Sequence, residues 1–171
     1  MKKLFFFVLI ALNFFTTAQQ SPNIVKVIDA LTVRWDETAI ALKDYQGIQN
    51  FCSSEKYKTE TTGLLDQIHH WDTTLYFIVQ AKYEGTQDAE AAATLEDIEK
   101  LETEYSTVNF KTFILNECTM IKEIDDTFDK KTVKQYEKDI KKFEKELVKY
   151  LNSITYRIDI IDEHIHHLKL D

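Results

Sequence analysis

The sequence predicts an all-α fold, an antiparallel up-down bundle of about four long helices with coiled-coil-like packing. Between Thr132 and Leu168, apolar residues recur at steps of three or four, which indicates one helix with a single apolar face. A face of that length requires partner faces from other segments. The face consists of Val133, Tyr136, Ile140, Phe143, Leu147, Tyr150, Ile154, Ile158, Ile161, Ile165 and Leu168.

Three further segments carry comparable patterns. Ser21 and Pro22 are typical of a helix start, and the spacing that follows predicts a helix over about 22–51, with Gly47 tolerated inside it. Residues 53–62 are polar and predict a loop or a frayed helix start. A second helix is then expected over about 64–84, ending at Gly85 as its C-terminal cap.

The third helix is expected over about 88–126, with Thr86 or Asp88 as its cap. The last helix is expected to begin at Thr132, where Thr132 and Gln135 fit a capping box.

An α+β fold is the alternative, because several segments are rich in β-branched and aromatic residues. The clearest are 31–35, 75–79, 106–115 and 154–160. A sheet of this size needs tight turns, whereas the chain has three Gly and one Pro and contains no Asn-Gly or Asp-Gly pair. The shortage of turn residues favours helices.

The first eighteen residues predict a secretory signal peptide. Lys2 and Lys3 precede an apolar run over 4–15, and Thr16-Thr17-Ala18 is a small-residue cleavage site. We therefore expect export to a periplasmic or extracellular location, with residues 19–171 forming a single domain. A retained anchor is the alternative, although the run is shorter than the roughly 20 residues that span a bilayer.

Charge restricts the classes of partner. The formal net charge is −8, and removal of the signal peptide makes the chain more acidic because Lys2 and Lys3 leave with it. Such a chain repels phosphate backbones and anionic lipid, so binding to nucleic acid or to a membrane surface is not expected as the main role. Stable membrane insertion after signal cleavage is not expected because the mature chain has no apolar run long enough to span a bilayer. The lysine-rich segment 130–149 is interpreted as the solvated face of the last helix, with a charged partner surface as the alternative.

Cys52 and Cys118 are the two cysteines of the chain. Export to an oxidising compartment predicts a disulfide between them. Both lie the same distance from the expected starts of the first and third helices, which would place them at equal height in the bundle. Those helices would be diagonal, so the bond requires a pinched bundle, and two buried thiols are the alternative.

The five histidines fall into two groups, His69-His70 and the cluster His164, His166 and His167. Glu163 and His166 have the spacing of ligands in di-iron bundles, which makes the cluster a weak metal-site candidate. Helix geometry directs these side chains away from the apolar face, whereas bundle metal sites project inward. We therefore expect no structural metal site.

The sequence contains no catalytic or cofactor-binding motif, so no catalytic residue and no cofactor are predicted. The expected function is an exported, non-catalytic interaction or structural protein with an unidentified protein partner. A metal-binding protein that uses the C-terminal histidines is the first alternative, and a membrane-acting bundle is the second. Tyr156, Ile160 and Phe77 form a candidate partner surface, unless the last helix buries two of its faces.

Overall fold

The longest element of the computed structural model is α7 (Lys130–His167), the helix predicted by the C-terminal apolar face. The structure describes residues 22–104, 106–122 and 129–167, so the predicted signal peptide lies outside the described residues. The helices before it are α2 (Pro22–Leu42), α3 (Tyr45–Ser53), α4 (Glu55–Thr86), α5 (Ala89–Glu104) and α6 (Thr107–Lys122). The described residues contain helices and no strand, so the all-α prediction is confirmed and the α+β alternative is not.

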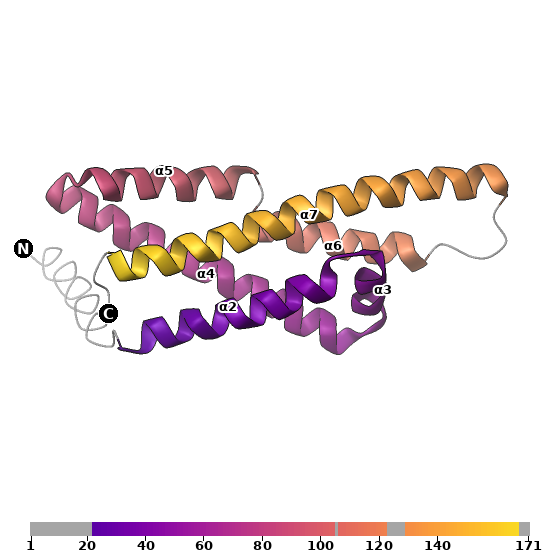
Figure 1. Ribbon diagram of the computed structural model, residues 1–171, viewed down its shortest axis with the longest axis horizontal. Helices are drawn as coiled ribbons and strands as arrows, with labels where there is room; N and C mark the ends of the chain where they lie inside the picture. Colours follow the sequence, from indigo (N-terminus) through magenta and orange to yellow (C-terminus); the bar gives the residue numbers. More distant parts are fainter. Residues whose placement is uncertain (1–21, 105, 123–128, 168–171) are drawn as a thin grey trace, which may run out of the picture.

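The chain passes along the molecule four times (Figure 1). Helix α2 leads to the short α3 at one end, and α4 returns to the other end. Helices α5 and α6 together form the third pass, and α7 returns so that its last turns lie near the start of α2. Helix α4 packs against α2, α3, α5, α6 and α7, which makes it the central helix of the bundle. The expectation of four continuous helices is wrong, because two of the passes are broken.

The first break separates α2 from α3 at Lys43 and Asp44. The Asp44 carboxylate accepts a hydrogen bond from the Gly47 backbone N–H at 2.9 Å and caps the new helix. At Gly47 the chain passes so close to the end of α2 that a Cβ atom would lie 2.0 Å from the Ala41 carbonyl oxygen. Gly47 is therefore required by this close approach, and the expectation of a tolerated glycine inside one long helix is wrong.

The second break separates α5 from α6. The Ser106 hydroxyl accepts a hydrogen bond from the Asn109 backbone N–H at 3.0 Å, as the cap of a new helix does. Over the described part of 88–126 the expected single helix is thus two helices, and its expected end near 126 lies outside the described residues. At its start, Asp88 accepts from the Glu90 N–H at 3.0 Å, which agrees with one of the two expected caps.

Other helix ends also differ from the expectations. Helix α4 begins at Glu55, where the Ser54 hydroxyl caps it. Of the two expectations for residues 53–62, a loop or the start of the next helix, the structure therefore agrees with the helix start. The last residue of α4 is Thr86, and its left-handed cap is Gln87, with φ of 55°, and not Gly85. Helix α7 begins at Lys130 because Asp129, rather than Thr132, accepts the first free backbone N–H groups.

The core is continuous along all four passes. Trp35 is fully buried, its ring meets Phe110 edge-on at 6.3 Å between centroids, and its indole N–H donates to the Thr155 hydroxyl at 3.0 Å. Trp35 thus joins α2 to α6 and α7 through apolar area and one satisfied polar group. The apolar face of α7 is buried from Phe143 to Ile165, while Val133 near its start is exposed.

The structure joins Cys52 of α3 to Cys118 of α6 in a disulfide, with the two Cα atoms 5.1 Å apart. Helices α3 and α6 pack directly against each other, so no pinching of a diagonal is required. The equal heights expected for the two cysteines assume two continuous helices, whereas both are broken in the structure. The bond closes a loop of 66 residues. In the chain-entropy model such a loop contributes on the order of 4 kcal/mol to stability.

Gly47→Ala should destabilise the protein by about 1–3 kcal/mol, because the added methyl group meets the backbone of α2 and not a flexible side chain. Gly63→Ala is the matched control. A Cβ there meets nothing within 4 Å, and Gly63 lies inside α4, so the substitution should stabilise by about 0.5–1 kcal/mol. Urea unfolding measures both. Equal effects of the same sign would contradict the close approach at Gly47.

Candidate functional site

A charged residue occupies the buried face of α4. Asp72 lies one turn from Ile68 and Leu75 on the face that packs into the core, and only 5% of its surface is exposed. A buried carboxylate is costly unless a cation and hydrogen bonds compensate it. The position therefore requires a partner from another helix.

Arg157 of α7 supplies that partner. It is 2% exposed and lies between the buried residues Ile154 and Ile158 of the same helix. Its Nη1 atom donates to Asp72 Oδ2 at 2.7 Å and to Glu102 Oε2 at 2.6 Å. One guanidinium thus joins α7 to both α4 and α5, and short charge-assisted hydrogen bonds of this kind are the strong ones.

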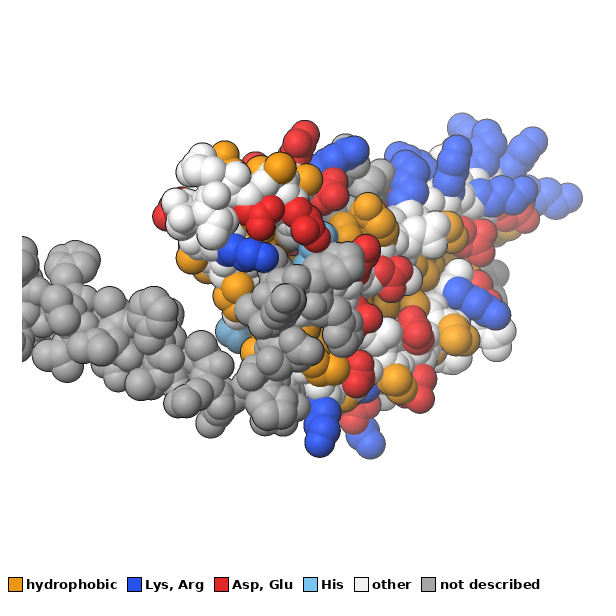
Figure 2. Space-filling view, turned by 60° about the vertical axis from the view of Figure 1, so that its left-hand side comes forward, with side chains coloured by type: hydrophobic (Ala, Val, Ile, Leu, Met, Phe, Trp, Pro, Cys, Tyr) orange, Lys and Arg blue, Asp and Glu red, His pale blue; other side chains and the backbone are white. Residues whose placement is uncertain are grey.

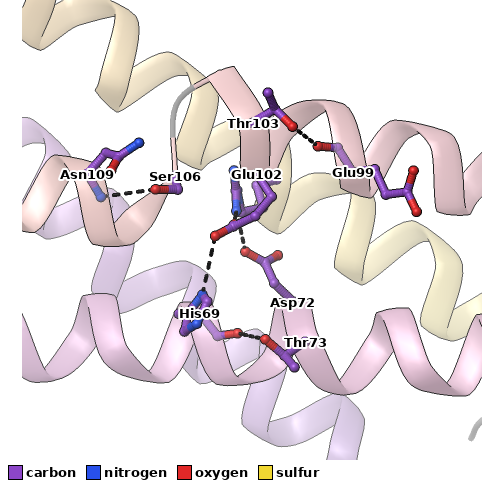
Figure 3. A network of polar contacts seen from close by, with 9 residues as sticks. His69, Asp72, Thr73, Glu99, Glu102, Thr103, Ser106 and Asn109 are labelled. Atoms are coloured by element: carbon purple, nitrogen blue, oxygen red, sulfur yellow. Dashed lines mark hydrogen bonds and ion pairs between the residues drawn. The ribbon is translucent and has the colours of Figure 1, made fainter.

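Glu102 and His69 extend the network toward the surface. The other Glu102 oxygen, Oε1, lies 3.8 Å from His69 Nδ1, and both side chains are 42% exposed. Figure 3 shows His69 and Asp72 on one helix, with Glu102 reaching toward them from another. We call Asp72, Arg157, Glu102 and His69 the ion network.

Burial dominates the acidity of Asp72. Loss of water around its carboxylate raises the pKa from 3.8 to about 6, although the nearby Arg157 guanidinium favours the charged form. The Glu102 carboxylate also contributes to this rise, whereas His69 lowers the pKa of Asp72. Asp72 therefore titrates near pH 6, above the range of an ordinary surface aspartate.

No member of the ion network lines the two hollows that the described residues form. A cavity of about 10 Å³ lies elsewhere, between α3, α6 and α7, where the hydroxyls of Tyr45 and Tyr136 are in contact. That volume holds about one water. A larger hollow of about 310 Å³ is open to solvent against Lys130 and Glu137. The arrangement of the ion network suits joining three helices.

Of the predicted histidine candidates, the structure describes the side chain of His164. His164 of α7 lies against the buried Thr94 hydroxyl of α5, with its ring nitrogens at 3.2 and 3.3 Å. The side chains of His166 and His167 lie outside the described residues. His69 belongs to the ion network, and His70 meets the Trp71 ring at 5.8 Å. Within the described part of the chain, no group of three potential metal ligands comes together.

The candidate partner surface is only partly exposed. Phe77 is 62% exposed and Tyr156 is 53% exposed, but Ile160 is 6% exposed and is removed from this surface. The alternative that the last helix buries two faces holds here, because α7 packs against α2 on one side and α4 and α5 on another. Ile160 and Arg157 lie on neighbouring positions of that second buried face.

No helix among the described residues is both long and apolar enough to cross a membrane. Comparison of the chain with protein-family models found no match. Comparison with characterised proteins likewise found none, and no solved structure matches it.

Sequence reasoning missed Arg157 and Glu102. The sequence did carry a signal for the buried Asp72–Arg157 pair. Asp72 occupies a position in the α4 apolar pattern where an apolar residue is expected. A buried acid implies a buried base, and Arg157 stands between Ile154 and Ile158 in the strongest apolar pattern of the chain. Pairing them needs the relative height of α4 and α7, which periodicity does not provide.

Arg157→Met should destabilise the protein by about 3–5 kcal/mol, because it leaves the Asp72 carboxylate buried without its cation. Arg34→Met is the matched control. Arg34 is exposed, and among the described residues its side chain donates to the Gln67 side chain alone, so its loss should change stability by about 0.5 kcal/mol or less. Chemical unfolding at pH 7 measures both. Similar costs for the two variants would show that the ion network does not hold the helices together.

Asp72 should also make stability depend on pH. Its pKa is raised in the folded state, so its contribution is greatest below pH 3.8 and is lost as the pH rises through about 6. Relative to Asp72→Asn, the wild-type free energy of unfolding should fall by about 3 kcal/mol over that range. Unfolding at a series of pH values measures the difference. Parallel curves for the two proteins would contradict the raised pKa.

Proposed function

We propose that this protein is an exported, non-catalytic binding or structural protein that contacts its partner with the outer surface of the bundle. The observation that carries the proposal is the filled interior. Buried apolar residues run along all four passes, and the buried side chains of Asp72 and Arg157 form an ion pair with each other. Small-molecule sites are instead concave, with a few polar groups left to face a ligand.

A fixed outer surface supports binding of this kind. The disulfide ties α3 to α6, and Arg157 ties α7 to α4 and α5. Partners that bind a preorganised surface lose less conformational freedom on association. Phe77 on α4 and Tyr156 on α7 are large rings on such a surface, and exposed aromatic residues are enriched at interfaces.

Export is supported by the basic pair, apolar run and small-residue site at the start of the chain. The disulfide is a second, independent argument, because such bonds persist in oxidising compartments and are rare in the cytosol.

The test has two measurements. Intact mass of the protein recovered outside the cytoplasm should correspond to a chain that begins at Gln19. The recovered protein should then sediment with the cell-envelope fraction, and Phe77→Ala with Tyr156→Ala should weaken that association about tenfold or more, since aromatic anchors often contribute 2 kcal/mol.

The double variant Val33→Ala with Ile40→Ala is the matched control, because it also removes two exposed large hydrophobic side chains, here from α2. It should leave the association unchanged. Retention of Met1 in the recovered protein would contradict export. Equal loss in both double variants, or tight retention of a metal ion or small molecule by the purified protein, would contradict binding through the proposed surface.

A further inference from the structure

The first half of α7 concentrates the positive charge of an acidic protein. Residues 130–149 contain eight lysines and four acids, although the whole chain has a formal net charge of −8. All eight lysines are exposed. Figure 2 shows lysine side chains gathered at one end of the molecule. The eight are Lys130, Lys131, Lys134, Lys138, Lys141, Lys142, Lys145 and Lys149.

These lysines share one face of the helix. At 100° per residue they fall within an arc of about 120°, centred opposite the buried residues Phe143 and Leu147. At 1.5 Å per residue the arc extends for about 29 Å. Val148 is the remaining residue of the arc. We call these eight side chains the lysine stripe.

The lysine stripe is narrow and has acidic edges. Glu137 and Glu144 lie on one side of it and Asp139 and Glu146 on the other, at about 80–120° from its centre. Among the described residues, Lys149 pairs with Glu146 at 3.0 Å, while the other seven lysines make no ion pair. A broad anionic surface would meet the flanking carboxylates as well, but a single polymer chain laid along the arc would not.

We infer that the lysine stripe is a binding surface for a linear anionic polysaccharide, a single-chain polymer bearing carboxylate or sulfate groups. This inference deepens the proposed function and rests on it for the outward-facing mode of binding. Regularly spaced charges on a polymer release condensed counterions when lysines neutralise them, which isolated acidic side chains on a protein do not. A surface pair between two proteins is worth little by comparison.

Two other polyanions fit the stripe less well. Helices that lie on membranes insert an apolar face into the bilayer, but here that face, including Phe143 and Leu147, is packed inside the bundle. Single-stranded nucleic acid is held by stacking of its bases on aromatic side chains, and its phosphates are often bound by the forked arginine side chain. The arc that carries the lysine stripe contains no aromatic residue and no arginine.

The experiment measures binding of the purified protein to fluorescent heparin and polygalacturonate at about 50 mM salt. Heparin presents sulfate and polygalacturonate presents carboxylate, so the two probes separate the anion classes. A quadruple variant should weaken binding about tenfold or more and flatten its salt dependence. It carries Lys134→Gln, Lys138→Gln, Lys141→Gln and Lys145→Gln. All four positions are exposed, so the fold should be retained, as circular dichroism would verify.

The matched control carries Lys26→Gln, Lys43→Gln, Lys56→Gln and Lys100→Gln, which remove the same charge from exposed positions outside the stripe. It should bind like the wild type. Equal weakening in both variants would overturn the inference in favour of a net-charge effect. Tighter binding to single-stranded DNA or to phosphatidylglycerol vesicles than to both polysaccharides would overturn it in favour of nucleic acid or of a membrane surface.

Absence of binding to either polysaccharide would also overturn the inference. It would leave the proposed function standing if the wild type still sedimented with the envelope fraction through Phe77 and Tyr156.

Discussion

The Arg157–Asp72 pair is the interaction on which the arrangement of the helices depends most directly. Apolar faces at three- and four-residue spacing tolerate sliding by a turn, because one leucine or isoleucine replaces another. A buried guanidinium has no such freedom, since its partner must lie within hydrogen-bonding distance at one height and in one direction. The contact with Glu102 adds α5 to the same constraint, so three helices share one register.

The cost of this constraint falls on the ionised form of Asp72. Its pKa of about 6 means that burial favours the neutral acid more than water does, even beside a cation. An apolar pair at the two positions would often be at least as stable. The ion network is therefore better understood as a device for specificity than as a source of stability.

The fold class followed from periodicity, because the α7 face from Phe143 to Ile165 is regular over many turns. The breaks in the first and third passes did not follow from it. Asp44 and Ser106 are recognisable caps, but each also fits a helical pattern that continues through it. What decides the first break is the distance from Gly47 to the Ala41 carbonyl, a tertiary fact. The ion network was likewise hidden, because its members come from helices whose relative heights depend on those breaks.

Helix α3 has nine residues, fewer than an isolated helix needs to persist in water. One end is turned against α2 at Gly47 and the other is bonded to α6 through Cys52. Reduction of that bond would leave α3 held by its buried side chains, Ile48 and Phe51 among them. The stability of residues 45–53 is thus coupled to the thiol–disulfide potential of the surroundings.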